Sequence, residues 1–97
     1  YPVTPLHTLI IPFRHVESYF ELNKEELDSC NDLLESQKQF FDQSDGEITG
    51  YNIGVNIGSD AGQTVNHCHI HLIPQNSTHF HQTISNGYSS INWEIIT

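Results

Sequence analysis

Runs and alternations of apolar residues predict three strands in this chain. Thr8–Ile11 is a short apolar run closed by Pro12, which is typical of a strand. In Tyr51–Gly58 the odd positions are apolar and the even ones are Asn or Gly, which predicts a half-buried antiparallel strand. The glycines leave room over its polar face. Ser59–Gly62 should turn the chain into a further strand that runs from Thr64 to Ile73.

A long helix is predicted between the first two of these strands. After a single helical turn in His15–Phe20, Asn23 and Glu26 form a capping-box pattern that should begin a helix from about Lys24 to about Phe41. One stripe of this helix should pack on the sheet, namely Leu27, Cys30, Leu34, Gln37 and Phe41. The pattern therefore predicts one domain over residues 1–97 in which a long helix packs on a sheet.

The charge balance limits the partners of this domain. Among 97 residues the 3 basic ones, Arg14, Lys24 and Lys38, oppose 12 acidic ones, and the formal net charge is −9. Such a surface repels nucleic acid and anionic membranes, both of which are bound through Lys and Arg. A phosphate-bearing ligand would therefore have to be held locally, by imidazoles, backbone amides and polar side chains.

Two cysteines, Cys30 and Cys68, are too few for a disulfide framework. Their positions on a predicted helix and inside a predicted strand favour free buried thiols and a reducing compartment, so we expect a cytoplasmic protein. No charged-then-apolar leader and no apolar stretch of about 20 residues is visible, so the sequence predicts neither a secretory signal nor a membrane span.

Three histidines alternate with apolar residues in the last predicted strand. Because strand side chains alternate between faces, His67, His69 and His71 should share one face. The opposite face, which should pack under the helix, receives Cys68, Ile70 and Leu72. The imidazoles should then lie beside the Asn and Gly face of the neighbouring strand.

Three interpretations of this histidine row compete. The first is an exposed strand without a role, which is our expectation for His79 and His81 in a polar loop. The second is a zinc site, but at about 3.3 Å per residue His67 and His71 lie about 13 Å apart, too far to share one ion easily. A zinc ion is therefore possible but not expected for chemistry. The third, which we favour, is nucleophilic catalysis.

Neutral imidazole is a nucleophile towards phosphorus and is available near neutral pH. The central residue of the row, His69, is the natural nucleophile, and its two neighbours are suited to binding the phosphoryl group and protonating a leaving group. Just before the strand, Gly62, Gln63 and Thr64 offer amide and hydroxyl donors for phosphate oxygens.

The segment from Gly62 to Pro74 resembles the signature of the histidine triad (HIT) family, His-x-His-x-His followed by two apolar residues. Upstream, Pro5–His15 is similar to that family's first strand and the turn after it, and Asn56–Gly62 is similar to its Asn-x-Gly turn. Ser90–Trp93 is similar to a Trp-bearing tail of some bacterial members.

This resemblance implies an α+β fold, an antiparallel sheet with a long and a short helix packed on it, and a two-fold homodimer. It also implies a metal-independent enzyme that hydrolyses or transfers a nucleoside monophosphate, preferably a purine nucleotide, through a nucleotidyl-histidine on His69. It implies that His67 and His71 orient the phosphate and the nucleophile, and that His7 is a fourth active-site histidine. By the same resemblance Asn56, Gly62, Gln63 and Thr64 contact phosphate or support the histidines. Trp93 would lie near the partner's site or pack in the dimer interface.

Some positions depart from the family pattern. Gln75 stands where many dinucleoside polyphosphate hydrolases carry Arg, and Leu6 replaces a common Gly. The family's first hairpin would precede Tyr1, so the resemblance implies a domain without that hairpin. A nucleoside phosphoramidate and a dinucleoside polyphosphate remain alternative substrates. A nucleotide-binding or interaction protein with weak turnover, or a histidine-based metal-binding module, remains an alternative to the enzyme.

Overall fold

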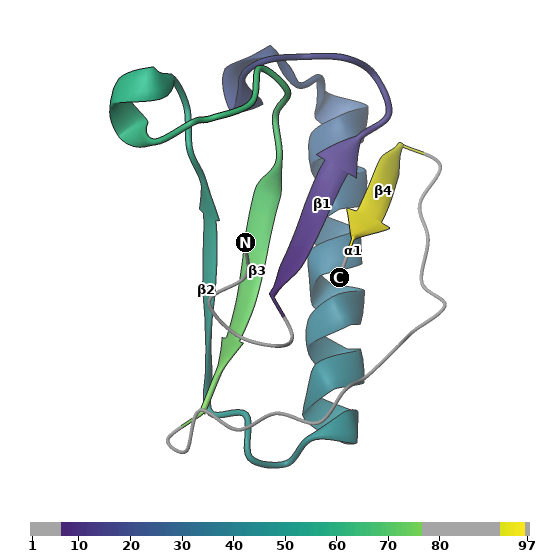
Figure 1. Ribbon diagram of the computed structural model, residues 1–97. Helices are drawn as coiled ribbons and strands as arrows, with labels where there is room; N and C mark the ends of the chain where they lie inside the picture. Colours follow the sequence, from purple (N-terminus) through teal and green to yellow (C-terminus); the bar gives the residue numbers. More distant parts are fainter. Residues whose placement is uncertain (1–6, 77–91, 97) are drawn as a thin grey trace.

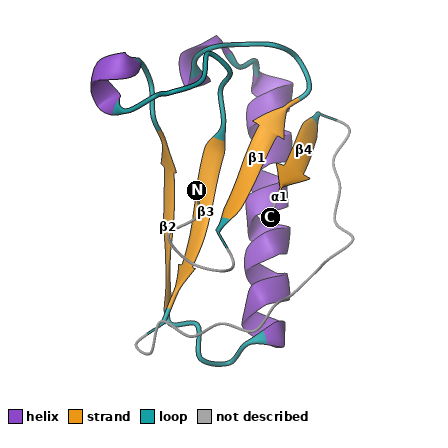
Figure 2. Ribbon diagram, viewed as in Figure 1, coloured by secondary structure: helices purple, strands orange, loops and turns teal. Residues whose placement is uncertain are grey.

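The computed structural model describes residues 7–76 and 92–96, and the loop with His79 and His81 lies outside them. Within the described residues the elements in chain order are β1 (Thr8–Pro12), η1 (Tyr19–Glu21), α1 (Lys24–Ser44), β2 (Gly50–Val55), η2 (Ser59–Ala61), β3 (Ile70–Gln75) and β4 (Trp93–Ile96). The four strands form one sheet in the order β2-β3-β1-β4, and all neighbours are antiparallel. The long helix α1 lies across one face of this sheet (Figures 1 and 2), which confirms the predicted α+β fold.

The helix begins where the capping box predicted. The side chain of Asn23 accepts a hydrogen bond from the amide of Glu26, and the carboxylate of Glu26 accepts one from the amide of Asn23. The helix ends at Ser44, three residues beyond the expected end at Phe41, and the turn at Asp45 follows. The predicted single turn is the short 3-10 helix η1, which begins at Tyr19.

The buried stripe of α1 differs from the predicted one. Cys30, Gln37 and Phe41 are buried as expected, but Leu27 and Leu34 are only partly buried, and Glu26 and Leu33 are buried instead. Figure 1 shows α1 behind β1 and β4, so that β2 at the far edge receives less cover. The buried stripe is therefore rotated around α1 relative to the predicted one, because it faces the part of the sheet that the helix covers.

The strand predicted from Thr64 to Ile73 is shorter than expected. It begins at Ile70, and Pro74 lies inside it rather than ending it. Residues 63–69 have no strand partner; the amide of Cys68 instead donates to the carbonyl of Val16 at 2.7 Å, in the loop after β1. The predicted alternation nevertheless continues through this segment: Cys68, Ile70 and Leu72 are buried, whereas the histidines between them are half-buried.

The core lies between α1 and the sheet. Ile10, Ile70, Leu33 and Trp93 belong to one buried cluster, and Cys30 and Cys68 are both free and buried in it, as predicted. The opposite face of the sheet is covered by no described helix. In the described part of the chain we find no helix with the length and apolar character needed to cross a membrane.

Candidate active site

The histidines of the predicted row gather into two groups rather than one. Nε2 of His7 and Nδ1 of His71 lie 2.8 Å apart and share a hydrogen bond, and the rings of His71 and His69 lie 5.0 Å apart in an edge-to-face arrangement. His67 instead contacts His15, whose ring centroid is 4.8 Å from its own. The structure thus brings three predicted residues together and pairs the fourth with a histidine to which the sequence assigned no role.

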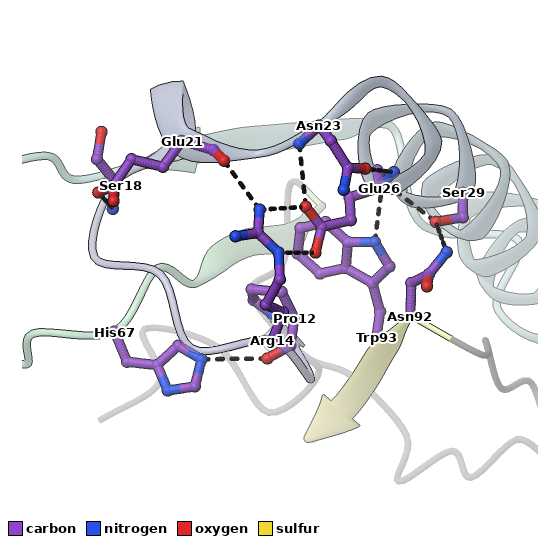
Figure 3. A network of polar contacts seen from close by, with 10 residues as sticks. All are labelled: Pro12, Arg14, Ser18, Glu21, Asn23, Glu26, Ser29, His67, Asn92 and Trp93. Carbon is purple, nitrogen blue, oxygen red and sulfur yellow. Dashed lines mark hydrogen bonds and ion pairs between the residues drawn. The ribbon is translucent and has the colours of Figure 1, made fainter.

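Two backbone carbonyls set the protonation of the ring nitrogens. A carbonyl oxygen only accepts hydrogen bonds. Nδ1 of His69, 3.0 Å from the carbonyl oxygen of His67, must therefore carry a hydrogen. In neutral His69 this leaves the lone pair on Nε2. By the same reasoning Nε2 of His67 donates to the carbonyl of Pro12 at 3.1 Å, as Figure 3 shows.

The environment favours the neutral imidazole at His7 and at His71. Partial burial lowers the pKa of His71 below its ordinary value of 6.5, and the neighbouring His69 and His7 lower it further because charges of like sign repel. Partial burial also lowers the pKa of His7. At neutral pH these rings therefore serve as hydrogen-bonding partners without a fixed positive charge.

The residues expected to contact phosphate mostly hold their own loop. Asn56 Nδ2 donates to the carbonyl of Ala61 at 2.7 Å, beside Gly62, whose φ of +94° requires a residue without a Cβ. The amides of Gly62 and Gln63 donate to Ser59 and Gly58 within the turn. Thr64 is exposed, so its side chain remains accessible to a ligand.

Gln63 connects this turn to the loop after β1. Its Oε1 accepts from the amide of Gly58 at 2.8 Å, and its Nε2 donates to the carbonyl of Glu17 at 2.8 Å. Both ends of the side chain are therefore engaged, which agrees with support of the histidine-bearing segment and not with a free phosphate donor.

Trp93 does not occupy the position that the resemblance implied. It is 1% exposed in the core of its own chain, and its indole Nε1 donates to the carbonyl of Glu26 at 2.9 Å (Figure 3). Substrate contact and dimer-interface packing are therefore both wrong for this geometry. Strand β4, which pairs with β1, carries the ring into the core under α1.

An ion pair anchors the loop that follows β1. Arg14 donates through Nε and Nη2 to the two carboxylate oxygens of Glu26, at 3.1 and 2.7 Å, and Nη2 also donates to the carbonyl of Glu21. The Glu26 side chain is only 6% exposed, and its bond to Arg14 holds the pKa of that carboxyl below its usual value. The sequence analysis predicted neither this ion pair nor a role for His15, because both depend on contacts made only in the folded chain.

An open hollow of about 430 Å³ lies beside the histidines, lined among others by His7, His71, Asn52 and Asn56. Its volume lies within the range of about 300–1,000 Å³ that is usual for small-molecule pockets. Gly54 pairs with His71 across the strands, and a Cβ at Gly54 would meet no atom within 4 Å. The missing side chain therefore leaves space directly beside His71.

Metal binding has no assembled site in the described residues, 7–76 and 92–96. No group of three His, Cys, Asp or Glu side chains there is arranged to hold an ion. The His67 ring lies apart from the other three rings and contacts His15 instead.

Comparison with known proteins gives related sequences. The HIT domain family model matches residues 1–78. A 16.1 kDa HIT-like protein of Mycoplasma pneumoniae is 32% identical over 102 residues, covering 100% of this chain and 70% of that protein. The asymmetrical bis(5'-nucleosyl)-tetraphosphatase of Schizosaccharomyces pombe is 35% identical over 79 residues, covering 81% of this chain and 43% of the relative. The chain thus spans less than half of that enzyme.

Solved structures show the same fold. The Caenorhabditis elegans NitFhit protein superposes with a TM-score of 0.73 at 32% identity, covering 89% of this chain and 20% of that one. The diadenosine triphosphate hydrolase of Plasmodium falciparum gives a TM-score of 0.72 at 31% identity, over 79% of this chain and 52% of the other. With a family model across most of the chain and these neighbours, the protein belongs to the histidine triad family.

Proposed function

We propose that this protein is a nucleotide phosphohydrolase or nucleotidyltransferase that acts through a nucleotidyl-histidine on His69. One observation carries the proposal: the Nδ1 hydrogen of His69 is directed to the carbonyl of His67 at 3.0 Å, which leaves the Nε2 lone pair for attack. The comparisons support it, since relatives named as a bis(5'-nucleosyl)-tetraphosphatase and a diadenosine triphosphate hydrolase share this domain.

The reaction has two displacements at the α-phosphorus. In the first, Nε2 of His69 forms a bond to phosphorus while the bond to the leaving group breaks, and the leaving group keeps the electron pair. An amine leaving group also takes up a proton from solvent water. In the second, a water oxygen attacks phosphorus, the P–N bond breaks and its electron pair returns to Nε2. The proton of the water passes to solvent or to the His7–His71 pair.

Neutral His71 serves this chemistry as a hydrogen-bond donor to a phosphoryl oxygen. Its Nδ1 is shared with His7, so Nε2 is the nitrogen that remains for the ligand. Because the chain has a net charge of −9, a preformed set of neutral donors has to replace the Lys and Arg that commonly bind phosphate. Thr64, exposed at the entry to the segment, is the further donor that we assign to phosphate.

The hollow beside Gly54 should hold the nucleotide. Leu9 and Ile73 are partly buried on the face of the sheet that also bears His71, and they offer an apolar surface for a nucleobase. A purine would cover this surface best. The substrate is a nucleoside phosphoramidate or a dinucleoside polyphosphate.

The proposal is tested by incubation with diadenosine polyphosphates and with adenosine phosphoramidate. We expect release of AMP by the wild type and a loss of nearly all of that release in His69→Ala. Calorimetry on the same samples examines the alternative of a binding protein. AMP binding without AMP release would favour that alternative. If AMP neither binds nor is released, the enzyme and the binding protein are both contradicted. A chelator added to the assay should leave the rate unchanged, since we propose metal-independent chemistry.

The position of the nucleotide is tested by filling the space beside His71. Gly54→Val should weaken substrate binding strongly, because its side chain would occupy the hollow without a clash that disturbs the strand. Gly50→Val is the matched control, since Gly50 lies on the same strand and face about 13 Å away and also has open space around its Cα. Equal loss in both variants would contradict the proposed position.

We also propose a homodimer formed through β2. This strand ends the sheet on one side, and its Ile53 is 60% exposed next to an apolar groove of about 250 Å³ lined by Leu27, Leu34 and Val55. Pairing of two copies would cover this edge by a two-fold axis. Light scattering should show a dimer for the wild type and a monomer for Ile53→Asp, and a monomeric wild type would contradict the assignment.

A further inference from the structure

His67 has two separate tasks in this structure, and both depend on its position. Its carbonyl accepts the Nδ1 hydrogen of His69 at 3.0 Å, and its ring donates through Nε2 to the carbonyl of Pro12 at 3.1 Å. If His67 moves, the hydrogen bond that leaves the lone pair on Nε2 of His69 moves with it. The placement of His67 therefore governs the reactivity of His69.

Pairing within β3 does not provide that placement. Residues 63–69 lie outside β3, and apart from the turn at Gly58 the contacts that hold them come from Pro12 of β1 and from the loop between β1 and η1. The amide of Cys68 donates to the carbonyl of Val16 at 2.7 Å, and Nε2 of Gln63 donates to the carbonyl of Glu17 at 2.8 Å. This loop therefore fixes the position of the histidine-bearing segment, residues 63–69.

His15, in the same loop, adds a side-chain contact to these backbone contacts. Its ring centroid lies 4.8 Å from that of His67 at an interplanar angle of 70°, an edge-to-face arrangement that aromatic rings favour. Together with the carbonyl of Pro12, the last residue of β1, it holds the His67 ring at two points. Such a contact resists rotation of that ring away from the Pro12 carbonyl.

The neighbours of His15 on both sides are fixed. Arg14 is bound to Glu26 at the start of α1, as Figure 3 shows, and the carbonyl of Val16 holds Cys68. Val16 itself is 4% exposed in the core. The backbone of His15 is thus held between two anchored residues, which leaves its ring in a defined place although it lies at the surface.

We propose that His15 is a positioning residue that keeps His67, and through it the nucleophile His69, in the reactive arrangement. This inference rests on the proposed function. It assigns no proton transfer to His15, which acts through ring contact alone and does not touch the reacting atoms.

The proposal predicts a specific kinetic pattern. His15→Ala should lower kcat about tenfold with KM nearly unchanged, because a small misplacement of a reacting group slows chemistry more than binding. His15→Phe should restore most of the rate, since it keeps the ring edge but has no titratable nitrogen. Phe13→Ala is the matched control, because it removes a 59% exposed ring from the same loop.

Nitrogen-15 NMR of the histidine rings provides a readout that is independent of turnover. In the wild type His67 should carry its hydrogen on Nε2 and His69 on Nδ1, two opposite tautomers in one segment. His15→Ala should give a mixture at both rings, and His15→Phe should keep the wild-type pattern. Should alanine lower the thermal midpoint, His15→Asn repeats the test with a polar side chain of similar length and no ring.

The possible outcomes separate this inference from the proposed function. Unchanged tautomers and an unchanged kcat in His15→Ala would overturn the positioning role. A His15→Phe variant as slow as His15→Ala would also overturn it, because a nitrogen and not a ring contact would then be needed. If the wild type releases no AMP, the proposed function fails, whereas the tautomers of His67 and His69 still decide the role of His15.

Discussion

His71 and His69 are only two residues apart, yet the fold holds them by different means. His71 lies inside β3, paired with Leu9 on one side and Gly54 on the other. His69 precedes the strand, and its ring is oriented by the carbonyl of His67, which in turn is held by Pro12 and His15. The first is fixed by a backbone ladder, and the second by contacts with the end of β1 and the loop that follows it.

Because of this difference, the position of His71 and the reactivity of His69 should respond to different substitutions. A ladder of backbone hydrogen bonds tolerates most side-chain changes, because the side chains do not make the bonds. The loop-held segment depends on a few identified groups, including Gln63, the Arg14–Glu26 pair and the His15 ring. Substitutions there should alter the site while the sheet stays intact.

The largest effect on activity should come from substitution of His69, in the loop-held segment. His69→Ala removes the proposed nucleophile and should lower AMP release by about 10³-fold or more, as losses of other catalytic nucleophiles do. His71→Gln keeps a donor on the strand-held side and should cost about 10²-fold or less. Steady-state kinetics on both variants measures the ratio, and a greater loss in His71→Gln would reverse the assignment of roles.

The next effect should be on stability. Arg14→Ala leaves the carboxylate of Glu26, whose side chain is 6% exposed, without its charged partner. The half-exposed arginine reduces the cost of a broken buried pair, so we expect a moderate decrease in the free energy of unfolding. Urea denaturation measures this value.

Hydrogen exchange on the same variant locates the change. Amides of residues 63–69 should exchange faster in Arg14→Ala, while those of the β2–β3 ladder should keep their protection. As a control, Lys38→Ala removes the exposed ion pair with Asp42 and should leave both regions unchanged. Uniform loss of protection across the sheet would show that the loop is not a separate support.

Two glutamines offer a matched comparison of the two regions. Gln63 joins Gly58 to Glu17 in the loop-held part, whereas Gln75 on β3 donates only to the side chain of Asn52 among the described contacts. Gln63→Ala should lower kcat about tenfold through looser positioning of the histidines. The kcat of Gln75→Ala should stay close to that of the wild type. A greater loss of kcat in Gln75→Ala than in Gln63→Ala would contradict the difference between the two regions.

The smallest effect concerns pH. The pKa values of His7 and His71 lie below 6.5 in the folded chain because of partial burial, so the unfolded chain binds protons first as the pH falls through 6.5. Stability should therefore decrease from pH 7 towards pH 5, above the range where Glu26 titrates. Urea midpoints of the wild type and of a His7→Asn, His71→Asn double variant test this, and the double variant should show the flatter profile.

The faces of the histidine row were predicted from the sequence because they follow from side-chain periodicity, whereas the fold class was implied by the resemblance to the histidine triad family. The capping box of Asn23 and Glu26 also fixed the start of α1 correctly. Alternation persisted even at Cys68, outside the strand, since burial of every second side chain needs only an extended backbone.

What periodicity missed depends on contacts between distant segments. The start of β3 at Ile70 follows from the bond of Cys68 to Val16, and local pattern contains no sign of that partner. The same holds for Trp93, which β4 brings into the core beside β1. Gln63 was recognised through its motif, but only the folded chain shows that both ends of its side chain are occupied.

The central claim is a covalent bond to one histidine, and it is best tested by trapping that bond. The wild type is mixed with a dinucleoside polyphosphate, stopped with alkali within milliseconds to preserve an acid-labile P–N bond, digested, and analysed by mass spectrometry. We expect a nucleotidyl group on the peptide that contains His69, assigned to that residue by fragmentation. Turnover without any adduct, or an adduct on His67 or His71, would contradict it.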